Sequence, residues 1–302
     1  MGCGFVCPKL MWYNIHMIEV VPTFQESDLR PFYPIDGPRT AWIFSVYDRP
    51  DILLRDLDLA YPRPLFTPDD LMEFETTEDA REFHAMKTEI GYLQDLGIPA
   101  PRFGLATTEK RLLLQVELVK GLDPCELIGT PEAHAVDGMI EALEPMYNGL
   151  ISYLESKYVG GGPLLADIYG LNQYVFEPPQ EDSPGQMKLV DLDFYLAGYR
   201  DGSEDIPAVI AHHLGGLTLD IIDVHRHLDR PYGDLWDRAT TLGQVISTDT
   251  PVAEKFLDAA HQARYGDFDA LYNFHIAEED ETFRSFYPHT VKKARPTEVV
   301  TA

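Results

Sequence analysis

The amino-acid sequence predicts an α+β fold, in which a strand-rich first part precedes a helical second part. Three observations support this prediction. Short runs rich in β-branched and aromatic residues precede residue 121. Apolar residues at spacings of three and four dominate the sequence after it. The chain has 302 residues, 45% of them hydrophobic, which gives room for one large domain or two lobes around a cleft.

Four strands and one helix are expected in the first part. Thr40–Val46 and Asp51–Leu59 are typical of two strands joined by a tight turn. A helix follows within residues 76–97, because a threonine caps its start, acids fill its first turn and a glycine ends it. Residues 98–121 give two more strands around a turn. This order indicates a small sheet with one long helix.

Long amphipathic segments fill the second part. Apolar spacing predicts a helix over Ala135–Tyr158, and Pro145 is expected to kink it. Two further helices are predicted over Asp205–Leu228 and Thr250–Gly266. We therefore divide the chain into a leader (1–16), a first lobe (17–120), a second lobe (121–285) and a tail (286–302).

Acidic and amide side chains flank a predicted β-hairpin inside the second part. Its strands are Tyr174–Phe176 and Met187–Val190. Asn172 precedes the first strand and Asp191 follows the second, so the hairpin makes them neighbours, with Asp167 a few residues away. Carboxylate and amide oxygens suit Mg²⁺ together with substrate phosphates. A further carboxylate can receive or orient a hydroxyl proton.

The order of these elements resembles the protein-kinase-like superfamily, which includes protein kinases and aminoglycoside- or choline-type small-molecule kinases. The resemblance covers residues 35–227. It is carried by the helix segment "MKTEIGYLQDLGIPAPRF", the strand and hinge "LLLQVELVKGLDP", the spacing Asp167-x-x-x-x-Asn172 and the run "KLVDLDF" that contains Asp191. It implies a bilobal fold with a small antiparallel sheet lobe and a larger helical lobe, and nucleotide between them.

The resemblance also implies roles for individual residues. Asp167 would orient the acceptor hydroxyl, Asn172 and Asp191 would hold Mg²⁺, and Asp193 is a candidate for a second metal contact. The glutamate of the first-lobe helix would be Glu89, paired with Arg55 near the phosphates of ATP. The positions that would face the nucleotide are Gly37, Arg55, Glu117, Leu118 and Val119.

Several positions depart from the pattern of that superfamily. Arg55 stands where a lysine is expected, and an arginine is a bulkier, forked cation. The phosphate-covering loop contains a single glycine, Gly37. Leu165 and Ala166 replace the usual His or His-Gly before Asp167. A different α+β fold, with Asp167 and Asn172 as turn and cap residues, is the alternative.

Three functions follow as expectations. The first is an ATP- and Mg²⁺-dependent phosphotransferase; the short segment from Phe194 to Ala208 favours a small-molecule acceptor over a protein. The second is a pseudokinase that binds protein partners, which the departures favour. The third is a kinase-fold enzyme with other nucleotide chemistry, such as nucleotidyl transfer.

Composition limits the partners and the location. There are 24 Lys and Arg against 50 Asp and Glu, a net charge of −26, which argues against nucleic-acid binding. No apolar stretch approaches the roughly 20 residues of a membrane span. Three cysteines indicate a reducing, cytoplasmic setting. Gly2 and Cys3 are compatible with N-terminal acylation, but Val6 departs from the acylation pattern.

Histidines and aspartates between residues 212 and 227 offer a second constellation. The pairs are His212 with His213 and His225 with His227, with Asp220 and Asp223 between them. Neighbours one or two apart on a helix point in different directions, so a structural role is expected rather than a metal site.

Overall fold

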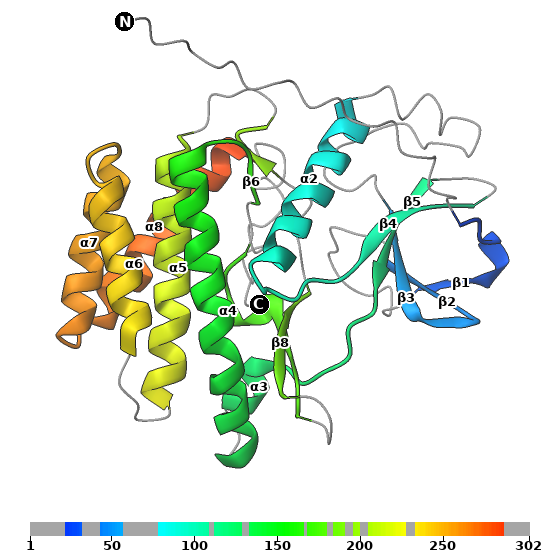
Figure 1. The fold of residues 1–302 in the computed structure, drawn as a ribbon, viewed down its shortest axis with the longest axis horizontal. Helices are drawn as coiled ribbons and strands as arrows, with labels where there is room; N and C mark the ends of the chain where they lie inside the picture. The colour runs from blue at the N-terminus through cyan, green and yellow to red at the C-terminus, as the bar shows by residue number, and fades with distance from the viewer. Residues whose placement is uncertain are drawn as a thin grey trace, which may run out of the picture. The chain divides into compact units, whose positions relative to one another are not determined.

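The computed structural model describes residues 22–31, 43–56, 78–108, 112–128, 133–165, 168–179, 184–190, 196–199, 205–227 and 233–286. The chain divides into two compact units. Unit 1 comprises Met1–Met72 and Phe103–Val116, and unit 2 comprises Glu73–Arg102 and Glu117–Ala302. The α+β class predicted from the sequence is confirmed, with a five-stranded sheet and a set of helices (Figure 1).

Unit 1 is built on a sheet with the strand order β1-β2-β3-β5-β4. Its strands are β1 (Leu29–Pro31), β2 (Ile43–Val46), β3 (Arg49–Asp56), β4 (Phe103–Thr107) and β5 (Leu112–Glu117). A short 3-10 helix, η1 (Glu26–Asp28), precedes β1. The predicted hairpin is confirmed as the antiparallel pair β2–β3, and the predicted second pair as β4–β5.

Alternate residues of these strands form the core of unit 1. Phe44 and Val46 of β2 are buried together with Ile52 and Leu54 of β3, because side chains two apart lie on one face of a strand. Ala106 of β4 and Leu113 of β5 complete the cluster, and Phe24 and Leu29 pack against it. The strand β1 was not predicted, since Leu29-Arg30-Pro31 is too short to carry a pattern.

Unit 2 is mostly helical. Its helices are α2 (Glu78–Asp95), α3 (Pro124–Ile128), α4 (Ala133–Gly160), α5 (Ile206–His227), α6 (Gly233–Ile246), α7 (Pro251–Arg264) and α8 (Phe268–Phe286). Among its described residues are also the short strands β6 (Leu164–Leu165), β7 (Tyr174–Glu177), β8 (Gln186–Leu189) and β9 (Leu196–Ala197), with a 3-10 turn, η4 (Leu171–Gln173), before β7. No helix in these described segments is long and apolar enough to cross a membrane.

Helix α5 is the central element of unit 2. It packs against α4, α6, α7 and α8 (Figure 1). Its sequence is apolar almost all round, and residues 208–218 are all buried, as expected for a helix enclosed on every side. Two glycines within it permit close approach: a Cβ on Gly215 would lie 2.5 Å from the ring of Phe274, and one on Gly216 would lie 2.4 Å from the ring of Tyr169.

Helix α2 belongs to unit 2, whereas the sequence analysis places it in the first lobe. It packs against α4 and β6. Its buried side chains include Phe83, Ile90 and Leu93, which lie on one face of the helix. After α2 the chain stays with unit 2, since the N–H of Leu189 in β8 donates to the carbonyl of Pro99 at 2.9 Å.

A glycine packed against a side chain and a glycine facing open space should respond oppositely to replacement by alanine. Gly216→Ala should destabilise the protein by about 1–3 kcal/mol, because the new methyl group collides with the buried Tyr169 ring. Gly91→Ala on α2 meets nothing within 4 Å and should stabilise by about 0.5–1 kcal/mol through helix propensity. Urea denaturation of both variants measures the difference. Equal effects of the two substitutions would contradict the packing of Tyr169 on α5.

Candidate functional site

The predicted hairpin between the candidate metal ligands Asn172 and Asp191 is confirmed as the antiparallel pair β7–β8. Tyr174 lies opposite Leu189 and Glu177 opposite Gln186. One residue beyond the strands, the N–H of Val190 donates to the carbonyl of Gln173 at 2.8 Å. The two residues that adjoin the candidates Asn172 and Asp191 are therefore bonded to each other.

A second pair of strands brackets the same region of sequence. Leu164 and Leu165 of β6 pair antiparallel with Ala197 and Leu196 of β9. All four side chains are buried. Leu165 lies two residues before Asp167, and Leu196 lies three residues after Asp193. The chain thus passes through paired strands both before and after the candidate site.

Three side chains hold the backbone between β6 and η4. The hydroxyl of Tyr174 donates to the carbonyl of Ile168 at 2.7 Å. Tyr169 bonds through its hydroxyl to Nε2 of His212 at 2.8 Å. The N–H of Gly170, a residue with a φ of 101°, donates to Oδ2 of Asp220 at 2.8 Å. Each of these anchoring groups is itself buried.

A stripe of residues along α5 supplies most of this anchorage. His212, Gly216 and Asp220 are four residues apart and therefore lie on one face of the helix. Each of them contacts the loop. The imidazole of His212 bonds the hydroxyl of Tyr169, Gly216 leaves room for the Tyr169 ring, and the carboxylate of Asp220 accepts a hydrogen bond from the N–H of Gly170.

The carboxyl of Asp220 is electrostatically unusual. Burial raises its pKa to about 7, the charge of Asp223 acts in the same direction, and the backbone N–H groups of Gly170 and Leu171 oppose the rise. The side chain is only 8% exposed. The group that fixes the loop therefore titrates near neutral pH.

Four of the candidate site residues fall outside the described part of the chain. They are Gly37, Asp167, Asp191 and Asp193. The backbone of Asn172 lies in η4, and the backbone of Arg55 lies in β3 opposite Ile43, but neither side chain is described. Their roles stay predictions.

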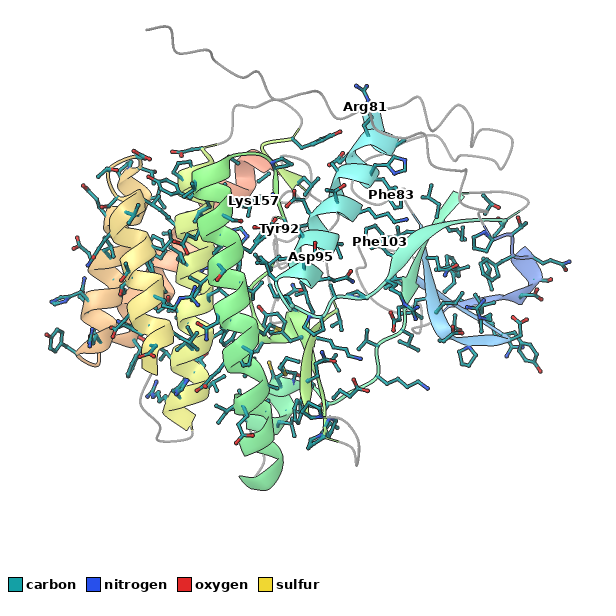
Figure 2. The ribbon with its side chains drawn as sticks, in the orientation of Figure 1. Arg81, Phe83, Tyr92, Asp95, Phe103 and Lys157 are labelled. Atoms are coloured by element: carbon teal, nitrogen blue, oxygen red, sulfur yellow. The ribbon has the colours of Figure 1, made fainter. Side chains whose placement is uncertain are left out.

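Glu89 has its own buried partners. Its Oε2 lies 2.5 Å from Nζ of Lys157 on α4, and the two side chains are only 9% and 10% exposed. The hydroxyl of Tyr153 donates to the same oxygen at 3.0 Å. Figure 2 shows Lys157 on α4 beside Tyr92 on α2. The pairing of Glu89 with Arg55 stays a prediction, and the described partners of this carboxylate all belong to unit 2.

Two aromatic faces enclose the Lys157 ammonium group. Its Nζ lies 5.6 Å from the centre of the Tyr92 ring and 5.4 Å from that of Tyr153, close enough for cation–π attraction. The pairing of Lys157 with Glu89 was not predicted from the sequence. The available signal is that Met146, Leu150, Tyr153 and Lys157 recur at spacings of four and three, which puts a lysine on the buried face of α4.

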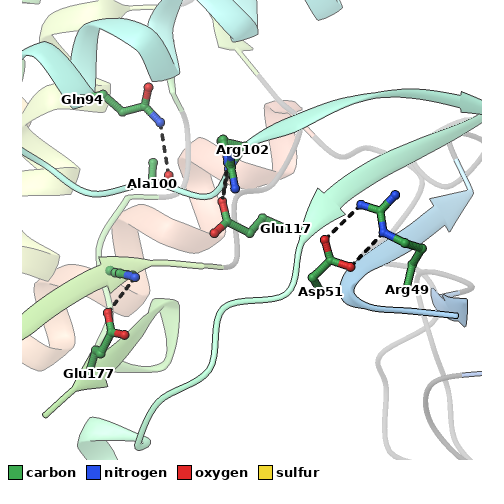
Figure 3. Close-up of polar contacts among 8 residues, drawn as sticks. Arg49, Asp51, Gln94, Ala100, Arg102, Glu117 and Glu177 are labelled. Carbon is green, nitrogen blue, oxygen red and sulfur yellow. Dashed lines mark hydrogen bonds and ion pairs between the residues drawn. The ribbon is translucent and has the colours of Figure 1, made fainter. Parts of the chain in front are cut away.

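The predicted hinge begins with an ion pair (Figure 3). Oε2 of Glu117 accepts one hydrogen bond from Nε of Arg102 at 3.1 Å and another from the backbone N–H of Arg102 at 3.2 Å. The N–H of Glu117 donates to the carbonyl of Arg102 at 2.8 Å. Leu118 and Val119 are half-buried, and within the described residues their backbone groups make no hydrogen bond.

His212, His213 and His225 of α5 are buried in the core. The ring of His212 stacks on His275 of α8 at 4.5 Å with an interplanar angle of 14°, and Nδ1 of His213 donates to the carbonyl of Val209 at 2.7 Å. Burial lowers the pKa of His212 to about 2 and that of His275 to about 4. Within the described segments, no group of three or more His, Cys, Asp or Glu side chains is arranged to hold a metal ion.

Comparisons with known proteins find little similarity. No protein-family model matches the chain, and no curated protein matches it. Among solved structures, it matches the crystal structure of a proinflammatory kinase, CtkA, from Helicobacter pylori, with a TM-score of 0.31 and 9% identity. The match covers 92% of this chain and 100% of that one. At this TM-score the resemblance does not bear on activity.

Removal of one partner from the buried ion pair should cost much more than removal from an exposed one. Lys157→Met should destabilise the protein by about 3–5 kcal/mol, because Glu89 is left charged and buried. Arg264→Met breaks the exposed pair with Asp237 and should cost about 0–1 kcal/mol. Urea denaturation compares the two variants. Similar losses would show that the Lys157 pair is as weak as a surface pair.

The raised pKa of Asp220 predicts an unusual pH dependence. The folded pKa of about 7 exceeds the ordinary value of 3.8, so the folded state holds a proton that the unfolded state has lost. Relative to Asp220→Asn, the wild type should therefore lose stability as pH rises from about 4 to 7, by up to about 1.4 kcal/mol per pH unit, and lose no more above that. Urea unfolding of both proteins at pH 5, 6, 7 and 8 checks this. A pH-independent difference would show that the carboxyl is not titrating in this range.

Proposed function

We propose that this protein is a kinase-like phosphotransferase that uses ATP and Mg²⁺ and phosphorylates a small molecule. One observation carries the proposal. The β7–β8 register and the Val190–Gln173 hydrogen bond join the residues next to Asn172 and Asp191, which supports a cation site shared by these two side chains. The anchored loop at Ile168–Gly170, one residue after Asp167, supports it further.

The chemistry of the candidate side chains fits a nucleotide and magnesium. Asn172, Asp191 and Asp193 offer amide and carboxylate oxygens, which Mg²⁺ prefers over nitrogen and sulfur. When bound, the ion would neutralise charge on the phosphates. Arg55 would add a cation to that end of the nucleotide, beside the loop with Gly37.

Asp167 would act on the acceptor. Its carboxylate would accept the hydroxyl proton as the acceptor oxygen bonds to the γ-phosphorus of ATP and the bond to the β-phosphate oxygen breaks, releasing ADP. The main-chain groups of Leu118 and Val119 would meet the adenine, whereas the N–H of Glu117 is already bonded to Arg102. The strongly acidic composition favours a cationic acceptor, because it attracts positive charge.

A pseudokinase that works through protein partners is the second candidate. The observation that favours it is the engagement of Glu89, whose carboxylate is neutralised by Lys157 and bonded by Tyr153. A glutamate with these buried partners has less to offer Arg55, and the phosphate end then lacks one of the charges that catalysis uses.

Nucleotide-dependent stabilisation tests the proposal. ATP with Mg²⁺ at saturating concentration should raise the melting temperature by about 2 °C or more, because only the folded state binds. ATP without Mg²⁺ should give a smaller rise. Asp191→Ala should abolish the magnesium-dependent part, whereas Asp258→Ala, which removes an exposed acid of α7, should leave it intact.

The two candidates predict different results in that measurement. An unchanged melting temperature at millimolar ATP and Mg²⁺ would contradict the phosphotransferase and favour a pseudokinase. A full magnesium-dependent rise in Asp191→Ala would exclude Asp191 as the metal ligand.

A further inference from the structure

The phenol of Tyr153 connects helix α2 to strand β6. It is fully buried on α4. Its hydroxyl donates to Oε2 of Glu89 at 3.0 Å and accepts the N–H of Leu165 at 3.0 Å. One oxygen atom therefore links a carboxylate on α2 to the main chain two residues before Asp167.

Lys157 fixes the orientation of this link. The ammonium group lies 2.5 Å from the oxygen that Tyr153 bonds, and it lies one helical turn after Tyr153 on the same face of α4. With the Tyr92 and Tyr153 rings around it, the cation holds the carboxylate in place. A carboxylate bound in this way is a charged, strong acceptor for the phenol.

Strand β6 needs such support because it is very short. It has two residues, and its one pairing among the described residues is with the two residues of β9. Two-residue pairing supplies few hydrogen bonds, so a second attachment has a large share in fixing the strand. The N–H of Leu165 supplies it by bonding Tyr153.

We propose that Glu89, Tyr153 and Lys157 form a positioning relay that sets the path of the chain from β6 into the loop that carries Asp167. The relay rests on the proposed function for its catalytic meaning, since Asp167 is the residue that it positions. None of its three members needs to touch the substrate. Glu89 would thus serve the reaction through α4 and β6.

Tyr153→Phe separates this relay from a simple attachment between helices. The variant keeps the Glu89–Lys157 ion pair and the aromatic ring, and it removes only the oxygen that meets Leu165. Tyr158→Phe is the matched control. It removes a hydroxyl from the same helix, where that hydroxyl donates to Oδ2 of Asp249 at 2.6 Å, away from β6.

Amide hydrogen exchange of the full chain measures the positioning directly. In Tyr153→Phe, exchange at Leu165 should accelerate about tenfold or more relative to the wild type, while amides of the β7–β8 hairpin stay within about twofold. Tyr158→Phe should leave Leu165 unchanged. A wild-type exchange rate at Leu165 in Tyr153→Phe overturns the proposal, and so does equal acceleration at the hairpin, which would indicate general destabilisation.

Hydrolysis of ATP in the presence of Mg²⁺, with water as acceptor, provides the catalytic measurement. Tyr153→Phe should lower kcat about tenfold and change KM for ATP less than about twofold, because the relay positions a catalytic group and does not contact nucleotide. An unchanged kcat in an active protein overturns the relay. Absence of hydrolysis by the wild type counts against the proposed function, and the exchange rate at Leu165 then decides the relay alone.

Discussion

The contact of Tyr169 with the middle of α5 is the interaction on which the geometry of the candidate loop depends. A helix surrounded by four others has a fixed position, and Gly216 lets the aromatic ring approach its backbone. The imidazole of His212 and the carboxyl of Asp220, one turn to either side, then bind the phenol and the next amide. A loop held on a buried helix at three points has little freedom, and the loop is the segment that adjoins Asp167.

Side chains of α5 and α4 anchor the two ends of the backbone segment from Leu165 to Gly170. Asp220 holds Gly170, and Tyr153 holds Leu165. The residues between them include the predicted catalytic aspartate. Unit 2 therefore anchors the backbone on both sides of the candidate site.

Local patterns predicted the β2–β3, β4–β5 and β7–β8 pairs and the helices α2, α4, α5 and α7, but they could not predict tertiary partners. The hairpins β2–β3 and β7–β8 were found because alternation and turn residues are local signals. The Lys157 partner of Glu89 was missed, since it depends on which helix lies opposite. Two-residue strands such as β6 and β9 carry no periodicity at all. The available signal for the anchoring role of Asp220 is an acid four residues after a glycine in a segment rich in apolar residues. The predicted roles of Asp167, Asn172 and Asp191 rest on order along the chain, and the frame around them is what the structure adds.

The stacked imidazoles of His212 and His275 give the interior a definite response to acid. Each ring is neutral in the folded state because its folded pKa lies far below the ordinary value of 6.5. The unfolded chain takes up these protons first, so the histidines withdraw stability as pH falls below about 6.5, and they continue to do so until His275 titrates near 4 and His212 near 2. Asp220 works in the opposite sense over the upper part of that interval. Between about pH 6.5 and 4, protonation of the two histidines in the unfolded chain therefore lowers stability while the proton held by folded Asp220 raises it. Below about pH 4 only the destabilising effect of the histidines continues to grow.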